Sequence, residues 1–427
     1  MSSCQVPAVG SPLPALHDEA VIGGRSCALV EERKPKSESR PRKKLVRRTD
    51  RDYSQPLRLA VQLAFLGLNV WIGVQFYQWV RWAETAGQTR AVERPAGVEG
   101  WLPIAGLMQL KYVALTRQWP AIHPAGLFLI SAFLLMSFLL RKSFCSWLCP
   151  VGTLSEYLWK LGRYTFRRNF ALPRWLDVLL RGTKYLLLGF FVYAVAAMPA
   201  SAIVEFLSAP YGLIVDVRML NFFRFLGGTA AFVVLGLIVA SIFIQNFWCR
   251  YLCPYGALMG LVSMLSPVRI RRNEAACIDC AKCTRACPSA LPVDKLVQIR
   301  SAECTGCLEC VAVCPAQDAL VLSYVVGGVA APRLGSVAAG SRGLTPTAQT
   351  NAALRARISG IRPRGTRLPG ASSGLRGAIP TWSVAAGIAV LFFGLVGYAK
   401  LSGHWDTRLP QQVYFELVPH ASEAAHP

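Results

Sequence analysis

Residues 277–288 read CIDCAKCTRACP, and residues 304–315 read CTGCLECVAVCP. In both stretches three cysteines stand two residues apart, and a fourth follows after three more residues and precedes a proline. The same spacing therefore occurs twice within 39 residues and takes up eight of the 14 cysteines of the chain. Because thiolates at such short spacings hold metal centres, these two stretches decide what the surrounding segment folds around.

This doubled spacing is typical of domains that bind two [4Fe–4S] clusters, in which three neighbouring cysteines hold one cluster and the fourth crosses to the other. The predicted ligands are Cys277, Cys280, Cys283 and Cys314 for the first cluster, and Cys304, Cys307, Cys310 and Cys287 for the second. A structural zinc site is the alternative, but zinc sites usually combine two CxxC pairs and do not repeat the longer run. The sequence therefore predicts a protein that moves electrons one at a time.

The composition indicates a membrane protein, because the 427 residues are 53% hydrophobic and have a mean hydropathy of +0.37, more apolar than an ordinary soluble domain. Most of the long apolar runs approach the ~20 residues that cross a bilayer. These runs cover residues 59–80, 125–140, 185–198 with an extension to 207 beyond Pro199, 229–247 and 381–401. The predicted fold class is an integral membrane α-helical bundle of about five transmembrane helices, with a small α+β domain of the bacterial two-[4Fe–4S] ferredoxin type.

The chain carries a formal net charge of +23, and its basic residues are unevenly distributed. Segments 1–58, 141–184 and 248–380 together contain 37 Lys and Arg, whereas segments 81–123, 199–227 and 402–427 contain 8. Since basic loops stay on the cytoplasmic side, the sequence predicts a multi-pass protein of the bacterial inner (plasma) membrane. The amino terminus and both cysteine-bearing regions are expected in the cytoplasm, and the carboxyl terminus in the periplasm.

A second repeat lies where two apolar runs end. Residues 144–154 read FCSWLCPVGTL, and residues 248–258 read WCRYLCPYGAL. Each copy contains one Cys-x3-Cys-Pro pair, and the four candidate redox cysteines are Cys145, Cys149, Cys249 and Cys253.

Within each copy, a helical backbone would stack the two cysteines of a pair. A proline in the first turn of the next helix would place Cys149 and Cys253 near a helix amino terminus, which favours the thiolate. The four thiolates could hold an additional metal centre or form reversible disulfides, or the cysteines could only pack tight turns. Repetition of the whole pattern favours a redox or metal role.

Composition divides the chain into six segments. They are a disordered basic cytoplasmic arm (1–56), a membrane domain of four spans with both Cys-x3-Cys-Pro motifs (57–267), the two-[4Fe–4S] domain (268–324), a flexible Arg- and Gly-rich linker (325–380), a fifth span (381–401) and an external tail (402–427). The ten Lys and Arg of residues 33–51 favour contact with anionic membrane lipid over nucleic-acid binding. The eight Arg of the linker, which has no acidic residue, suggest the same lipid.

These motifs resemble those of the membrane-bound polyferredoxin family. RKSFCSWLCPVGTLSE at 141–156, NFWCRYLCPYGALMG at 246–260 and the doubled cysteine run carry the likeness, which covers about residues 57–324 and the last span. The family includes NapH/MauN-type quinol dehydrogenase subunits, the carboxyl-terminal half of NosR and CcoG-type accessory proteins. The resemblance implies a small helical membrane bundle with a cytoplasmic two-cluster ferredoxin, and the eight cluster ligands named above.

Two functions follow from that resemblance. The first is electron transfer between quinone or quinol and a redox protein partner, as the electron-transfer subunit of a quinol dehydrogenase. The alternative is an accessory or maturation factor for a periplasmic or membrane metalloenzyme, with the clusters and cysteine pairs as reductant. A transporter with an appended ferredoxin is disfavoured, because no span carries a charged residue at its centre. No flavin-binding segment precedes the first span and the external tail is short, so the nearest interpretation is a NapH-like or stand-alone relative.

Overall fold

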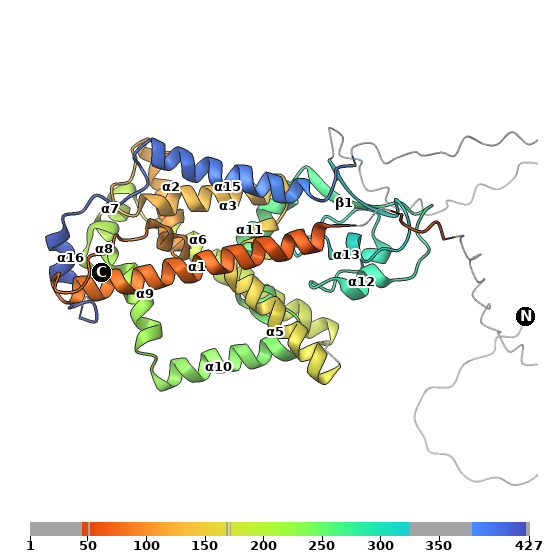
Figure 1. Cartoon of the computed structure of the whole chain (residues 1–427), viewed down its shortest axis with the longest axis horizontal. Coiled ribbons are helices and arrows are strands. Elements are labelled where there is room, and N and C mark those ends of the chain that lie inside the picture. The colour runs from red at the N-terminus through yellow and green to blue at the C-terminus, as the bar shows by residue number, and fades with distance from the viewer. Residues whose placement is uncertain (1–44, 50–51, 168–169, 171, 325–377, 424–427) are drawn as a thin grey trace, which may run out of the picture. The chain divides into compact units, whose positions relative to one another are not determined.

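The structure is a computed structural model that describes residues 45–49, 52–167, 170, 172–324 and 378–423 (Figure 1). The predicted arm up to residue 44 and the predicted linker at 325–377 lie outside the described residues. The described part is mainly helical. Its elements in chain order are α1 (Ser54–Glu84), η1 (Ala96–Trp101), α2 (Pro103–Thr116), α3 (Pro124–Leu140), α4 (Ser143–Trp147), α5 (Pro150–Phe166), α6 (Arg174–Ala197), α7 (Ala200–Ser208), α8 (Pro210–Leu213), α9 (Val215–Arg224), α10 (Gly228–Phe243), η2 (Trp248–Leu252), α11 (Pro254–Met264), β1 (Val268–Arg272), α12 (Lys282–Ala286), η3 (Val293–Lys295), α13 (Glu309–Ala312), β2 (Leu320–Tyr324), α15 (Ser383–Leu401) and α16 (Gln411–Leu417).

Among these helices, α1, α6 and α15 are each long and apolar enough to cross a membrane. The pair α9 and α10 would make a fourth span, bent by 83° at its break. The apolar helix α3 has 17 residues, about 25 Å, slightly less than the ~30 Å hydrocarbon layer. The predicted membrane bundle is therefore confirmed. Three or four helices are candidate spans by length and composition, close to the predicted five, and α3 covers the second predicted apolar run as a shorter helix.

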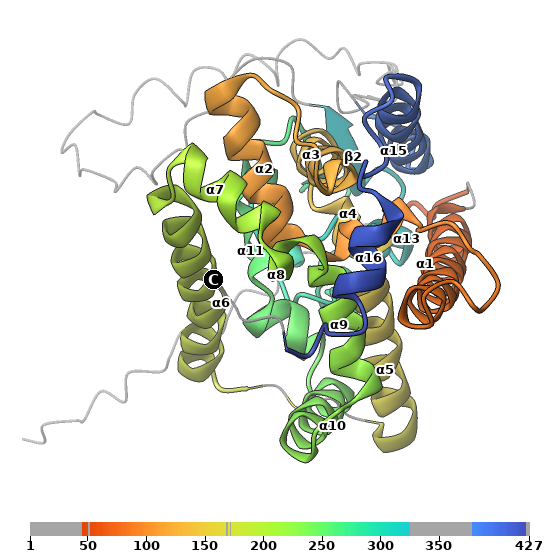
Figure 2. The same ribbon diagram turned by 90° about the vertical axis from the view of Figure 1, so that its left-hand side faces the viewer.

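The helix α3 packs against α2, α11 and α15, and Figure 2 shows it between α2 and α15. It is the most apolar partner of that core, with side chains such as Phe128, Ala132 and Met136 buried. Its burial explains how a helix slightly shorter than the bilayer still belongs to the membrane part, because its ends meet protein and not lipid.

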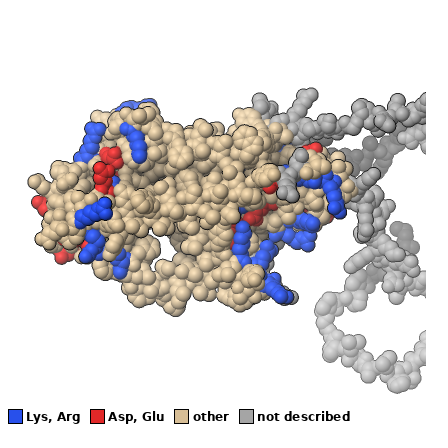
Figure 3. Space-filling view, in the orientation of Figure 1, with Lys and Arg blue, Asp and Glu red and all other residues tan. Residues whose placement is uncertain are grey.

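The middle of the bundle presents apolar side chains outward. Trp71 on α1, Phe232 on α10 and Phe393 on α15 are each more than half exposed. On the face in Figure 3, Lys, Arg, Asp and Glu gather toward the two ends, and uncharged residues cover the band over α1 and α15 between them. Such a band is what a helical bundle offers to lipid.

The end of the bundle that carries β1, α12 and α13 (Figure 1) holds the segment predicted as the two-cluster domain, residues 268–324, which is called the ferredoxin domain here. Its two strands pair antiparallel, from Val268 opposite Tyr324 to Arg272 opposite Leu320. Both cysteine runs lie between the strands in sequence, with α12 and α13 packed against each other. The α+β domain predicted from the cysteine spacing is present.

The residues just before α1 are fixed against this domain. Arg47 pairs with Ala316 in an isolated β-bridge, and the Arg48 N–H donates to the Pro315 carbonyl at 3.0 Å. The prediction of a disordered arm through residue 56 is therefore wrong for residues 45–49 and for the start of α1. These residues satisfy their backbone groups on the ferredoxin domain, which composition alone does not reveal.

The opposite end of the bundle, called the far end here, is held by a buried ionic cluster. Arg94 contacts Asp216 (2.7 Å) and Glu99 (3.0 Å), and His123 contacts Glu99 through Nδ1 (3.2 Å). His123 Nε2 also lies 2.9 Å from the Gly212 carbonyl. His123 and Asp216 are thus partnered residues that tie η1, α3 and α8–α9 together.

Candidate electron-transfer site

The first predicted cluster set surrounds one small cavity in the ferredoxin domain. All four of its cysteines, Cys277, Cys280, Cys283 and Cys314, line this cavity together with Pro315. Three come from the first cysteine run and one from the second, which is the crossed arrangement that the spacing predicts. The fit of four thiols around one cavity supports the ligand assignment, which stays a prediction.

The second predicted set is also gathered in space. The Cys310 thiol interacts electrostatically with Cys307, Cys304 and Cys287, so the fourth cysteine of the first run lies among three of the second. Cys304, Cys307 and Cys310 are buried, with exposed fractions of 7%, 8% and 6%. This second set lies deeper than the first, whose Cys277 and Cys280 are half-buried.

The two cysteine runs share an uncommon backbone conformation. Asp279 (φ 55°) and Gly306 (φ 64°) occupy matching positions, and so do Ala281 (φ 54°) and Leu308 (φ 60°). Left-handed conformations cost non-glycine residues roughly 1 kcal/mol or more each. Their repetition at matching positions indicates that each run wraps around a centre of the same kind.

Burial controls the protonation of these thiols. It raises the pKa of Cys287 to about 11 and also raises the pKa of Cys307 and Cys310. Such thiols stay protonated at neutral pH until a metal binds, because a metal deprotonates a coordinating thiol. Within the described residues, no three side chains of His, Cys, Asp or Glu lie close enough together to hold one metal ion.

The four cysteines of the Cys-x3-Cys-Pro repeat meet at a second cavity, called the four-cysteine cavity here. Cys145 and Cys149 line it from the first copy, and Cys249 and Cys253 line it from the second. The two copies are 104 positions apart in the chain, so only the packing of the two helical units brings them together. None of the four is in a disulfide.

Both copies have the same backbone geometry around the second cysteine. The Cys149 N–H donates to Phe144 O and the Cys253 N–H donates to Trp248 O, each at 3.0 Å. Each cysteine caps the amino terminus of the next helix, with proline at its first position, as predicted. The chain turns extended at Cys149 (ψ 118°) and Cys253 (ψ 105°), so the second cysteine of each pair separates two helical segments.

The protein alone does not favour the thiolate form that was expected of these cysteines. Burial raises the pKa of Cys145 to about 11 and of Cys149 to about 12, so burial outweighs the helix amino terminus. The Cys253 sulfur accepts a hydrogen bond from the Gly256 N–H at 3.2 Å. Because the pKa of Cys145 stays raised although Lys142 lies beside it, a metal is the partner that would deprotonate these thiols.

Two buried lysines that sequence reasoning missed lie beside these thiols. Lys142 is 3% exposed, lines the four-cysteine cavity and has no hydrogen-bond partner within the described residues. Lys184 on α6 is fully buried and pairs with Glu303 at 2.7 Å. Two ammonium groups against one carboxylate favour negative charge on the thiols. Only the position of Lys142, three residues before Cys145, could have indicated this role.

The four-cysteine cavity reaches the ferredoxin domain directly. Cys307, a predicted ligand of the second cluster, lines the same cavity. From the first motif copy, Ser146 Oγ donates to Thr305 O (2.7 Å) and Trp147 Nε1 donates to Gly306 O (3.2 Å). The residues between Cys304 and Cys307 are thus held by the motif that carries Cys145 and Cys149.

A buried arginine, Arg58 of α1, joins the membrane helices to the ferredoxin domain. It is 2% exposed and donates to the Ser146 carbonyl (3.2 Å) and the Cys307 carbonyl (3.4 Å). It also contacts the carboxylates of Glu156 and Glu309. One side chain therefore ties α1, α4, α5 and α13 into a rigid junction.

A large apolar cavity of about 1180 Å³ lies on the other side of the cysteines, inside the bundle. Cys149 and Cys253 line this cavity as well as the four-cysteine cavity. Its remaining wall is mostly aliphatic and aromatic, from α1, η1, α2, α3, α6, α11 and α15. The two cysteines therefore belong to the wall that the apolar cavity shares with the four-cysteine cavity, and the other shared residues are Phe144, Val151, Trp248 and Tyr255.

Comparison with known families identifies two kinds of segment. A family model described as a 4Fe-4S binding domain matches residues 122–170 and 226–273, and each of these segments contains one Cys-x3-Cys-Pro motif. A model described as a 4Fe-4S dicluster domain matches residues 269–315, which include all eight predicted cluster cysteines. The prediction of two [4Fe–4S] clusters is confirmed at this level.

Several known proteins are similar to this chain. YccM of Escherichia coli (strain K12), provisionally named an electron transport protein, is 45% identical over 369 residues, which are 86% of this chain and 91% of YccM. The methylamine utilization ferredoxin-type protein MauN of Paracoccus denitrificans is 32% identical over 175 residues, 40% of this chain and 56% of MauN. The ferredoxin-type protein NapH of Escherichia coli is 25% identical over 151 residues, 35% of this chain and 48% of NapH. No solved structure matches the chain.

Proposed function

Because the chain belongs to the family of membrane-associated ferredoxin-type electron-transport proteins, we propose that it passes electrons between the quinone pool of its membrane and a redox partner protein. Bound [4Fe–4S] clusters supply one-electron transfer. The observation that carries the proposal is the place of Cys149 and Cys253 in the wall shared by two cavities. These residues border both the apolar cavity and the four-cysteine cavity, and Cys307 borders the latter.

The residues of the chain supply positioning and charge for this route. Ser146 and Trp147 fix the loop around Cys307, and Arg58 fixes the helices on either side of it. Lys142 offers a positive charge to the four thiols. A rigid, water-poor junction favours electron transfer because little has to reorganise around the moving charge.

In this proposal the four motif cysteines act as one redox unit. The unit holds an additional metal centre, because the buried lysines favour the thiolates that would bind the metal. The eight ferredoxin cysteines would hold about eight iron and eight sulfide. Iron bound in excess of that number in the wild-type chain, and lost in Cys145→Ser and Cys249→Ser, would support a metal at the motif. Equal iron content in all three proteins would contradict a metal at the motif, and the four cysteines would then act as dithiols.

We also propose that the ferredoxin end faces the cytoplasm and the far end the periplasm. The 37-to-8 partition of basic residues between alternate segments supports this orientation. The helix α15 runs from beside the ferredoxin domain, where the Ile379 N–H donates to Leu322 O (2.9 Å), toward α16 at the far end (Figure 1). Reporter fusions after Leu322 and at the carboxyl end should report opposite sides, and two reports from the same side would contradict the orientation.

The test of the function is quinol-dependent reduction of the clusters in the full chain. Protein purified without oxygen and placed in lipid nanodiscs is mixed with a short-tailed benzoquinol or naphthoquinol, and cluster absorbance and EPR are followed. The proposal predicts reduction by quinol as well as by dithionite. Clusters that dithionite reduces but that neither quinol reduces, and that neither matching quinone oxidises, would contradict it.

A maturation role is the second candidate, and the four free thiols facing one cavity favour it. Two dithiol pairs can reduce a disulfide or a metal ion of another protein. Such a factor would cycle its motif cysteines between thiol and disulfide and would exchange no electrons with quinol. Thiol trapping during turnover therefore separates the two candidates.

A further inference from the structure

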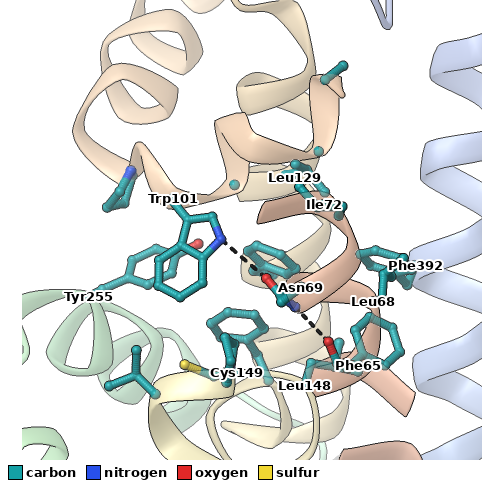
Figure 4. A pocket seen from close by; sticks show the side chains of 18 of the residues that line it. Phe65, Leu68, Asn69, Ile72, Trp101, Leu129, Leu148, Cys149, Tyr255 and Phe392 are labelled. Atoms are coloured by element: carbon teal, nitrogen blue, oxygen red, sulfur yellow. Dashed lines mark hydrogen bonds between the residues drawn. The ribbon is translucent and has the colours of Figure 1, made fainter. Parts of the chain in front are cut away.

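The apolar cavity has polar groups close to its cysteine wall, in addition to the charged side chains that line it at the far end. Figure 4 shows Tyr255, Trp101 and Asn69 directed into it, with Cys149 and Leu148 below them. We propose that this cavity binds the ring of a quinone, with the Tyr255 hydroxyl and the Asn69–Trp101 pair as its hydrogen-bonding groups. This inference rests on the proposed function, whose substrate it places.

The size and access of the cavity fit a ring with a long apolar tail. Its volume of about 1180 Å³ exceeds the ~300–1,000 Å³ of sites for drug-sized ligands. Its lining includes Leu68 of α1 and Phe393 of α15, which are 40% and 61% exposed on the apolar surface of the bundle. A ligand dissolved in the bilayer can therefore enter from the side.

Tyr255 breaks the symmetry of the repeat at the position that faces this cavity. The first copy has Val151 where the second has Tyr255, and both line the cavity. The ring of Tyr255 packs edge-on against Phe144 at 5.7 Å and Phe133 at 6.4 Å. Its hydroxyl has no hydrogen-bond partner within the described residues, so it can donate to a ligand oxygen.

Asn69 is a polar residue inside a membrane helix, and such residues are costly unless they have partners or a ligand. Its Nδ2 donates to Phe65 O at 2.8 Å, and its Oδ1 accepts from Trp101 Nε1 at 3.2 Å. One N–H of the amide remains unused in this part of the structure. An acyl chain of a lipid would satisfy neither this group nor the Tyr255 hydroxyl, whereas a quinone oxygen would.

The redox step balances with groups on this cavity. A quinol that becomes a quinone loses two O–H bonds, two electrons and two protons. The electrons leave one at a time, through the wall of Cys149 and Cys253, to the [4Fe–4S] clusters of the proposed function. The protons go to water at the far end, where the exposed carboxylates of Glu93 and Asp406 line the same cavity.

The experiment compares Tyr255→Phe with the wild-type chain in nanodiscs. Loss of one hydrogen bond to the ligand, about 0.5–1.5 kcal/mol, should raise the KM for quinol about three- to tenfold. Iron content and reduction by dithionite should not change. Tyr398→Phe is the matched control, because Tyr398 is on the membrane helix α15 but does not line the cavity.

A second measurement reports binding without turnover. A photoreactive azido-quinone should label residues of the cavity wall in the wild-type chain, and Leu187→Trp, which fills the cavity from α6, should abolish that labelling. Labelling only outside the cavity, or an unchanged KM in both Tyr255→Phe and Leu187→Trp, would overturn the site. If quinol never reduces the wild-type clusters while the label still maps to the cavity, the proposed function fails and the binding site stands.

Discussion

The two copies of the Cys-x3-Cys-Pro motif keep one backbone around their cysteines but bind different neighbours. In the first copy, Ser146 and Trp147 donate to the carbonyls of Thr305 and Gly306 in the ferredoxin domain. At the matching positions of the second copy, Arg250 and Tyr251 both bind Asp177 of α6, at 2.8 and 2.6 Å.

This difference separates two features of the motif: the placement of the cysteines, which both copies share, and the neighbour to which each copy is attached. The hydrogen bonds that place Cys149 and Cys253 are the same in both copies, so the cysteine geometry is the common element. The side chains between the cysteines have diverged, one pair toward the ferredoxin domain and the other toward α6. The first copy therefore couples the four-cysteine cavity to the clusters, and the second copy positions α6, which contributes to the wall of the apolar cavity.

The largest expected effect is at the attachment of the first copy. Arg58→Ala leaves Glu156 with Lys160 as its remaining cation and removes the donor to the Ser146 carbonyl. Removing one partner of a buried ion pair costs about 3–5 kcal/mol when the other is left unpaired, and the remaining Lys160 places the expected loss at the lower end of that range. Thermal unfolding in detergent should fall accordingly, with loss of cluster absorbance in the same transition.

The matched variant for the second copy is Arg250→Ala. Its partner Asp177 is 16% exposed and is also held by Arg181, and no residue of this ionic group belongs to the ferredoxin domain. We expect a smaller loss of stability and full retention of the clusters. Equal destabilisation, or cluster loss in both variants, would contradict the division of roles.

A pair of glycines at matching positions gives the second test. A β-carbon on Gly152 would lie 2.2 Å from the Cys145 carbonyl oxygen, whereas one on Gly256 would meet nothing closer than 3.5 Å. Gly152→Ala must therefore move backbone and should cost about 1–3 kcal/mol. Gly256→Ala should be close to neutral in the same thermal measurement, and the reverse ranking would show that the two turns are packed differently.

The smallest expected effect distinguishes the attachment of the first copy to the ferredoxin domain from a general effect on stability. Trp147→Phe and Tyr251→Phe each remove one hydrogen bond, worth about 1 kcal/mol. Only Trp147→Phe frees the carbonyl of Gly306 between Cys304 and Cys307, so only it should change the EPR spectrum of the second cluster. Identical spectra in the two variants would argue that the first copy does not tune that cluster.

Much of this arrangement was predictable because it depends on the spacing of cysteines and prolines in the sequence. The doubled cysteine run predicts the ferredoxin domain, and the proline after Cys149 and Cys253 predicts that a helix begins there. The convergence of the four thiols was not predictable, because the two copies lie 104 positions apart and meet only through packing.

The residues that sequence reasoning missed are those whose role depends on tertiary contacts. Lys142 and Lys184 look like ordinary basic residues at the edge of a membrane, yet both are buried beside the thiols or their neighbours. Arg58 belongs by sequence to a basic juxtamembrane run, yet it is the buried link to the ferredoxin domain. Hydropathy indicated the apolar runs, but not that α10 follows α9 at a bend of 83°.

The central claim is that electrons between the membrane and the ferredoxin clusters pass the four motif cysteines as one unit. Rapid anaerobic mixing of quinol with nanodisc-embedded Cys149→Ser, Cys253→Ser and the double variant tests it directly. The account predicts that each single variant loses quinol-dependent cluster reduction, that the double variant loses little more, and that dithionite still reduces both ferredoxin clusters, since groups that act as a unit are not additive. Full quinol-dependent rates in both single variants would contradict it.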